Sequence, residues 1–289
     1  MSENHILKTI LFTGFALIAF AANSVLCKLA LGENNIDASS FTIIRLLSGA
    51  IVLFIIINIK KKKKHASDTK GNWLASTMLF LYAITFSLAY ISLDTGTGAL
   101  ILFGSVQISM ITLSIFTGTR LHLTEWIGFI IAFLGFVYLI LPGVTAPSIQ
   151  GFFFMTVAGI AWGIYTLIGR NSKDALKDTT YNFIKTIPLL IILTILAFKN
   201  INYTTKGIWL AVLSGGITSG IGYTIWYNAL RNLTSTQAAV VQLLVPVIAA
   251  LGGVIFISEK ITFRLIAASF LILGGILIVV LGRKYFIRK

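Results

Sequence analysis

The sequence has few charged residues and almost no cysteine or histidine. Charged residues make up 11% of the 289 residues, and only nine residues are acidic, whereas 57% are hydrophobic. A soluble domain needs more polar residues than this to cover its core, so the composition predicts an integral membrane protein. The single cysteine, Cys27, excludes an internal disulfide, and none of the three histidines has a second ligand at zinc-like spacing. We therefore expect no metal and no other cofactor.

Long apolar runs fill most of the chain. A membrane-spanning helix needs about 20 mostly apolar residues, whereas the strands of a barrel would be about half as long and would alternate in polarity. Ten runs fit helices: 9–31, 41–59, 72–93, 97–117, 124–141, 150–169, 181–198, 207–230, 235–257 and 261–282. The sequence thus predicts an all-α integral membrane protein with ten transmembrane helices and no room for a soluble domain.

The basic residues predict the orientation of these helices. If the N-terminus is cytoplasmic, 16 of the 23 Lys and Arg residues fall in cytoplasmic segments and four fall in outer loops. Cytoplasmic loops are enriched in Lys and Arg, so both termini are expected inside. The run Lys60 to Lys64 fits a loop facing anionic headgroups better than a nucleic-acid patch. The expected partners are therefore membrane lipid and a small-molecule substrate, with no nucleic acid, and the protein is expected to be a monomer or homodimer.

The two halves of the chain resemble each other. KGNWLA at 70–75 corresponds to KGIWLA at 206–211, and Ala19, Phe20 and Lys28 precede Ala161, Trp162 and Arg170 by a constant 142 residues. Five spans in each half is an odd number, so the second copy must enter the membrane from the opposite side. We predict two inverted five-helix repeats, 1–145 and 146–289. In carriers of this architecture the substrate site lies near the midplane, on broken or kinked helices.

The stretch VVQLLVPVIAALGG at 240–253 carries Gln242 and, at the centre of the ninth span, Pro246. Proline lacks a backbone N–H, and its ring clashes with the carbonyl four residues back, which here belongs to Gln242. The carbonyl and the side-chain amide would be costly in lipid but could bind a substrate in a cavity. The alternative is a simple kink with an interhelical hydrogen bond. In the symmetry-related fourth span, Gln107 either contacts the substrate or holds neighbouring helices together by an interhelical hydrogen bond.

Further polar and aromatic side chains lie at membrane depth. They either face a cavity or belong to interfacial belts and helix contacts, and the sequence alone does not assign the face. The candidates for substrate binding are Asn23, Tyr82, Tyr90, Trp162, Tyr165, Tyr223 and Trp226.

Charged side chains are unevenly distributed with respect to depth. All nine acidic residues fall in loops or near span ends, which disfavours a proton relay and an efflux pump for lipophilic cations. Arg45 and Lys185 lie about one turn inside the outer end of span two and the inner end of span seven. Each either snorkels to headgroups or lines a vestibule, where Arg45 would match a carboxylate.

The second half carries motifs of a known family. FISEKITFRLIAASFLILGGILIV at 256–279, the preceding VPVIAALGGVIF and WYNAL at 226–230 resemble the EamA-type bacterial carriers of the drug/metabolite transporter superfamily. Glu259 matches the family's end-of-span glutamate, but its counterpart in the first half is Thr119, and Val245 stands where an acidic residue often precedes the proline. The resemblance implies a carrier in the bacterial cytoplasmic (inner) membrane, with a cavity built from spans one, three, four, six, eight and nine.

The expected function is therefore transmembrane transport of small metabolites, amino acid export or exchange first, by alternating access. The alternatives are a sugar-phosphate or nucleotide-sugar type exchanger and a small-drug efflux carrier. An enzyme would show clustered His, Asp, Glu or Cys at one depth, which the sequence does not.

Overall fold

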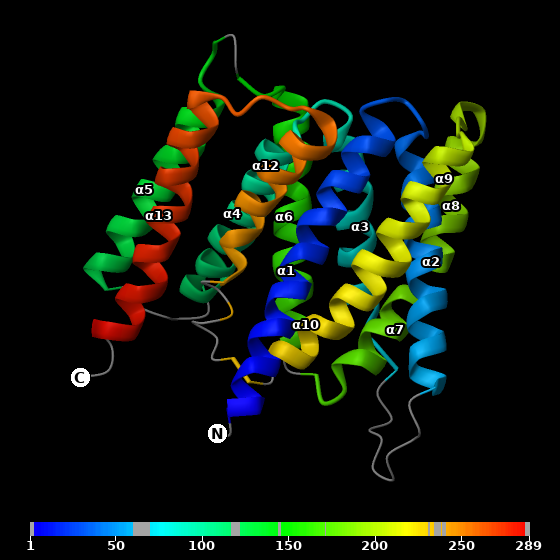
Figure 1. The fold of residues 1–289 in the computed structure, drawn as a ribbon, viewed down its shortest axis with the longest axis horizontal. Coiled ribbons are helices and arrows are strands. Elements are labelled where there is room, and N and C mark those ends of the chain that lie inside the picture. The colour runs from blue at the N-terminus through cyan, green and yellow to red at the C-terminus, as the bar shows by residue number, and fades with distance from the viewer. Residues whose placement is uncertain are drawn as a thin grey trace.

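The computed structural model describes residues 3–59, 70–116, 122–143, 146–170, 172–230, 232–233, 238 and 241–286. Within these residues nine helical segments are long and apolar enough to cross a membrane, and the shorter α12 is also apolar. Figure 1 shows the helices side by side in one bundle, with α1 beginning and α13 ending at the same end. The predicted fold class, an all-α bundle of ten spans in two inverted repeats, is confirmed.

The first half forms one helix for each span. These helices are α1 (Glu3–Leu31), α2 (Ala38–Ile59), α3 (Trp73–Tyr90), α4 (Thr95–Phe116) and α5 (Leu123–Ile140). The second half has more breaks. It contains α6 (Ile149–Arg170), α7 (Ala175–Lys185), α8 (Ile187–Ala197), the short 3-10 helix η1 (Phe198–Asn200), α9 (Thr205–Val212), the π-helix η2 (Leu213–Ile221), α10 (Gly222–Leu230), α12 (Leu244–Ile257) and α13 (Phe263–Phe286).

Three predicted spans of the second half are therefore not single regular α-helices. The seventh span consists of α7 and α8, which meet at Thr186, and Pro188 lies in the first turn of α8, where its missing N–H needs no intrahelical partner. The eighth span passes from α9 through η2 into α10. The predicted ninth span lies partly outside the described residues, and its helix α12 begins at Leu244.

Lys185, the last residue of α7, is tied to the start of α3. Its Nζ donates a hydrogen bond to the Gly71 carbonyl at 3.1 Å and lies 5.5 Å from the centre of the Trp73 ring. This lysine thus holds two helix ends together, where the sequence left open whether it snorkels to lipid or lines a vestibule.

The repeats are inverted and packed against each other. In Figure 1, α1 runs away from the end at which α13 finishes, whereas α6, its counterpart, runs toward that end. The last helices of the two halves, α5 and α13, pack together through glycine: a Cβ on Gly128 would lie 2.5 Å from the Gly275 carbonyl oxygen. Small residues at this crossing allow the two backbones to approach, as is typical of helix packing in membranes.

The outside of the bundle is apolar, and much of its polarity is inside. Large hydrophobic side chains such as Phe15, Phe54, Phe133 and Phe270 are exposed, whereas Asn23, Thr42 and Ser87 are buried among the helices. This inversion suits a lipid environment, because a polar side chain there needs a protein partner. The buried polar groups therefore indicate where to look for a site.

Candidate functional site

A small cavity lies near the middle of the bundle, where both halves contribute side chains. Its volume is about 20 Å³, enough for about one water molecule, so the site is closed in this conformation. The lining residues come from α1, α3, α4, α6, η2 and α10: Phe20, Asn23, Ser24, Tyr82, Phe86, Leu102, Phe103, Trp162, Thr218, Ser219 and Tyr223.

Asn23 connects the polar parts of this cavity. Its Oδ1 accepts hydrogen bonds from the Ser214 hydroxyl at 2.6 Å and from the Thr218 hydroxyl at 3.2 Å, and its Nδ2 lies 3.5 Å from the Tyr82 hydroxyl. Asn23 and Tyr82 belong to the first repeat, whereas Ser214 and Thr218 belong to the second. The hydrogen bonds of Asn23 therefore cross from one repeat to the other.

The π-helix η2 brings the second-repeat hydroxyls to Asn23. A π-helix has one more residue per hydrogen-bonded ring than an α-helix, so it changes the direction in which side chains point. Ser219 and Thr218 both donate to the Ser214 carbonyl, at 2.9 and 2.6 Å. Gly215 lies directly against the Arg45 backbone on α2, where the absence of a side chain lets η2 approach. The glycine-rich sequence around Thr218 is the signal for this irregular segment.

Aromatic rings form the opposite part of the wall. The Trp162 ring centre lies 4.8 Å from that of Tyr82 and 5.1 Å from that of Tyr223, while Phe20 meets Tyr223 edge-on at 5.9 Å. Rings at these separations attract each other and together form a continuous aromatic surface on this side of the cavity. The wall therefore suits a substrate with both an apolar body and a polar group.

Arg45 lies directly behind this wall. Its side chain is 1% exposed, and Nη2 donates a hydrogen bond to the Tyr82 hydroxyl at 3.0 Å. The guanidinium lies 5.2 Å from the Tyr82 ring centre and 5.0 Å from that of Phe86, and its Nε and Nη1 have no hydrogen-bond partner. The sequence left open whether Arg45 snorkels to headgroups or lines the outer vestibule, whereas the structure packs it inside the bundle, because α2 begins at Ala38 and Arg45 lies two turns into it.

The other predicted site residues surround the cavity without lining it. Tyr90 is fully buried and donates to the Thr95 carbonyl at 3.3 Å, and Tyr165 is stacked behind Trp162 at 5.3 Å. Trp226 packs against Phe20 in a separate cluster with Ala16, Ala229 and Ala238. The sequence-based candidate set contains four of the lining residues and lacks the other seven, because neither apolar nor small polar residues at membrane depth carry a signal of the face they occupy. The missing residues are Phe20, Ser24, Phe86, Leu102, Phe103, Thr218 and Ser219.

The glutamines and the proline lie on α4 and next to α12. Gln107 is buried on α4, and Gln242 is half-buried just before α12. Pro246 is the third residue of α12, a first-turn position at which proline leaves no intrahelical hydrogen bond unmade. None of the three lines the central cavity.

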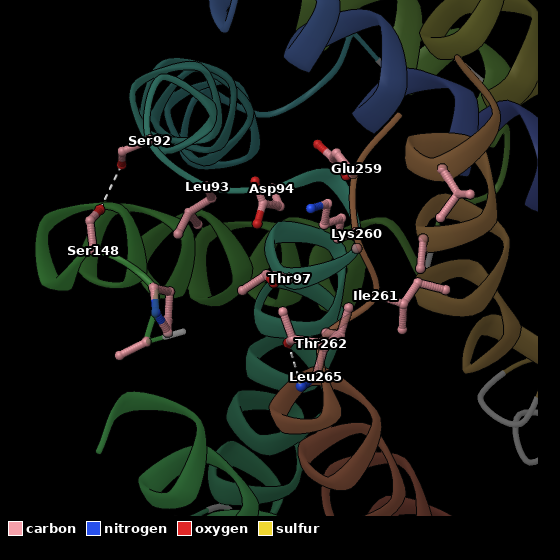
Figure 2. A pocket seen from close by; sticks show the side chains of 15 residues that line it. Ser92, Leu93, Asp94, Thr97, Ser148, Glu259, Lys260, Ile261, Thr262 and Leu265 are labelled. Atoms are coloured by element: carbon pink, nitrogen blue, oxygen red, sulfur yellow. Dashed lines mark hydrogen bonds between the residues drawn. The ribbon is translucent and has the colours of Figure 1, made fainter. Parts of the chain in front are cut away.

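A larger cavity of about 280 Å³ opens at the end of the bundle away from the start of α1. Figure 2 shows that Asp94 and Thr97 face Lys260 and Thr262 across it, with Glu259 above them. Both Glu259 oxygens accept from the Thr95 backbone N–H at 2.9 Å, and Oε1 also accepts from the Thr95 hydroxyl at 2.9 Å. Partial burial raises the pKa of the Glu259 carboxyl, and the bonds from Thr95 partly offset this. The carboxylate of the second repeat thus caps α4 of the first.

Two inverted helical repeats with a polar and aromatic cavity between them are the architecture of many secondary transporters. Comparison with known sequences agrees with this class. The model of the EamA-like transporter family matches residues 7–141 and again 149–281. The chain therefore belongs to the EamA-like transporter family and is a multi-pass membrane transporter of the drug/metabolite transporter type.

Related proteins are known from bacteria and archaea. A protein of Pseudomonas aeruginosa described as uncharacterized is 41% identical over 96% of both chains. An uncharacterized transporter of Archaeoglobus fulgidus is 28% identical over 79% of this chain and 83% of its own. A crystal structure with a TM-score of 0.63 covers 94% of this chain and 98% of its own at 16% identity, which shows the fold alone.

Proposed function

We propose that this protein carries small carboxylate-bearing metabolites, amino acids first among them, across the bacterial cytoplasmic membrane by export or exchange. The observation that carries the proposal is the central cavity, to which Asn23 and Tyr82 of one repeat and Trp162 and Tyr223 of the other contribute together. A rocking motion of one repeat against the other would expose this one site to each side in turn.

The residues have separate roles in this proposal. Asn23, with the hydroxyls of Ser214 and Thr218, supplies exchangeable hydrogen bonds, since these groups pair with each other in this structure. The rings of Tyr82, Trp162 and Tyr223 receive the apolar part of the substrate. Arg45, through its bond to Tyr82, attracts the carboxylate. The same buried positive charge argues against efflux of cationic drugs, because like charges repel strongly where water is excluded.

Counterflow in proteoliposomes tests the proposal. Vesicles with purified protein are preloaded with unlabelled amino acids, and entry of the labelled forms is followed for wild type, Tyr82→Phe and the control Tyr203→Phe. Tyr203 undergoes the same chemical change but is 57% exposed, outside the cavity. We expect Tyr82→Phe to reduce the exchange rate at least tenfold, or about 1.4 kcal/mol in activation free energy, and Tyr203→Phe to leave it unchanged.

Two results would contradict the proposal in different ways. Equal rates for Tyr82→Phe and Tyr203→Phe would mean that the central cavity is not the substrate site. If no amino acid or related carboxylate exchanges with wild type, the assignment to carboxylate-bearing metabolites is wrong. The roles of Gln107, Gln242 and Pro246 stay predictions. Gln242→Ala in the same assay tests whether Gln242 binds the substrate.

A further inference from the structure

Arg45 is the only Lys or Arg side chain that is buried within the described part of the chain. A guanidinium stays charged at every accessible pH, so burial does not neutralise it. Moving an ion out of water costs several kcal/mol unless an opposite charge and hydrogen bonds compensate for it. Arg45 has one hydrogen bond, to Tyr82, and two aromatic rings beside it. The nitrogens Nε and Nη1 are buried and unpaired.

No carboxylate compensates this charge within the residues that the structure describes. The acidic residues there all lie in loops or in the first turn of a helix, and the ion pair found among them joins Glu33 to Lys206. Two of these carboxylates accept hydrogen bonds from backbone N–H groups at the starts of helices. Asp37 accepts from Ser39 and Ser40, and Glu259 accepts from Thr95. Among the residues that the structure describes, the bundle therefore holds one positive charge at depth without an internal counter-charge.

The central cavity also has no group that would receive an ammonium ion by ion pairing. Its lining is neutral, with Asn23, hydroxyls and rings but no Asp or Glu. The faces of Tyr82 and Phe86, which could attract a cation, already lie against the Arg45 guanidinium. A second cation here would be repelled by the first at low dielectric. A carboxylate in the cavity, in contrast, would offset the charge of Arg45, which is connected to the lining by the hydrogen bond from its Nη2 to the Tyr82 hydroxyl.

We propose that the central site selects organic anions of single net charge: a carboxylate on an apolar or ring-bearing body, without an amine. The 2-oxo acids and aryl carboxylates belong to this class, whereas the corresponding amino acids are zwitterions of zero net charge. This inference rests on the proposed function, since it concerns the same cavity, and within the carboxylate-bearing metabolites it places amine-free anions ahead of the amino acids. Arg45 supplies the charge for which the bound anion is the counter-ion.

A matched set of ligands tests the charge rule directly. Phenylpyruvate and phenylalanine share the same ring and carboxylate and differ in having a ketone or an ammonium group, and phenethylamine has the ammonium without the carboxylate. Counterflow of each labelled compound is measured in vesicles preloaded with the same unlabelled compound, with protein-free vesicles as the correction for leakage. We expect phenylpyruvate to exchange at least tenfold faster than phenylalanine and phenethylamine not to exchange.

Variants of Arg45 test whether its charge causes the preference for phenylpyruvate over phenylalanine. Arg45→Gln is expected to remove the tenfold preference, and Arg45→Lys, which keeps the charge, to retain it at a lower rate. A control is Arg264→Gln, because Arg264 lies at the start of α13 and bonds the Leu139 and Leu141 carbonyls, away from the cavity. If Arg45→Gln does not fold, the comparison of the three ligands with wild type still decides the question.

The possible failures are distinct. Exchange of phenylalanine at a rate equal to or above that of phenylpyruvate would overturn the charge rule and leave the proposed function intact. A preference that survives in Arg45→Gln would overturn the role of Arg45. If neither these compounds nor the wider amino acid panel exchange, the proposed function itself is contradicted.

Discussion

At the scale of single residues, the side chains that matter are those whose partners lie in the other repeat. Asn23 is bonded to η2, and Glu259 is bonded to the N-terminus of α4. When the repeats move against each other, a bond that breaks favours the conformation in which it is formed, and a bond that is kept holds the repeats together. These residues therefore influence both stability and the balance between conformations.

Glu259 gives a prediction on pH dependence. Its pKa is raised in the folded protein, mainly because burial disfavours the charged carboxylate. Its contribution to stability is then fully present below the unfolded-state pKa of a glutamate and is lost as the pH rises through the higher folded-state pKa. We expect the difference in melting temperature between wild type and Glu259→Gln, measured in detergent, to shift against wild type as the pH rises from about 4 to 7. A shift in favour of wild type would contradict this sign. Other groups that face Glu259, Asp94 and Lys28, are present in both proteins.

At the scale of elements, the eighth span shows how an irregular helix can position a site. In a regular α-helix each backbone N–H bonds to the carbonyl four residues back, whereas η2 is a π-helix over nine residues, in which the partner is five residues back. This wider turn directs Ser214, Thr218 and Ser219 toward the first repeat. Its glycines make close contact with α2 possible, because a side chain at Gly215 would collide with the Arg45 backbone.

The contact at Gly215 predicts a difference between two identical substitutions. Gly215→Ala must push η2 away from α2, and overpacking of this kind costs typically about 1–3 kcal/mol. Gly274→Ala on α13 is the matched control, because a Cβ there would meet nothing within 4 Å and alanine favours helix. We expect thermal unfolding in detergent to show a clearly lower melting temperature for Gly215→Ala and an unchanged or higher one for Gly274→Ala. Equal melting temperatures would mean that the close contact is not significant for stability.

At the scale of the whole molecule, the inverted repeats define two ends of the bundle, and the charge distribution predicts which end faces the cytoplasm. In Figure 1, α8 ends at the end of the bundle opposite the start of α1, whereas α10 ends on the same side as that start. Lys199 lies in η1, directly after α8, and Asn232 follows α10 by two residues. The excess of Lys and Arg in the segments near the termini favours a cytoplasmic location for Asn232.

Cysteine labelling tests this orientation. The native Cys27 is buried, so it should give little background with a membrane-impermeant maleimide. We expect Lys199→Cys to be labelled in intact cells and Asn232→Cys to be labelled only after the membrane is permeabilised. The reverse pattern would show that the termini lie outside, and wild type serves as the control for Cys27.

The sequence by itself determined the ten apolar spans, their polar breaks and the inverted repeat. These features are local or additive: a span depends on about 20 consecutive residues, and an odd number of spans in each half forces inversion. For the same reason the sequence identified Asn23, Tyr82, Trp162 and Tyr223 as polar or aromatic side chains at membrane depth, without assigning the direction in which they point.

Only the tertiary structure decided which of these side chains meet. In a soluble helix the apolar face marks the core, but in a membrane both the lipid-facing and the protein-facing sides are apolar, so the pattern does not fix rotation about the helix axis. The burial of Arg45 between Tyr82 and Phe86, the π-helix at η2 and the bond from Thr95 to Glu259 all depend on that rotation and on contacts between residues far apart in the chain. The positions of these residues relative to the cavity therefore follow from the packing of the two repeats.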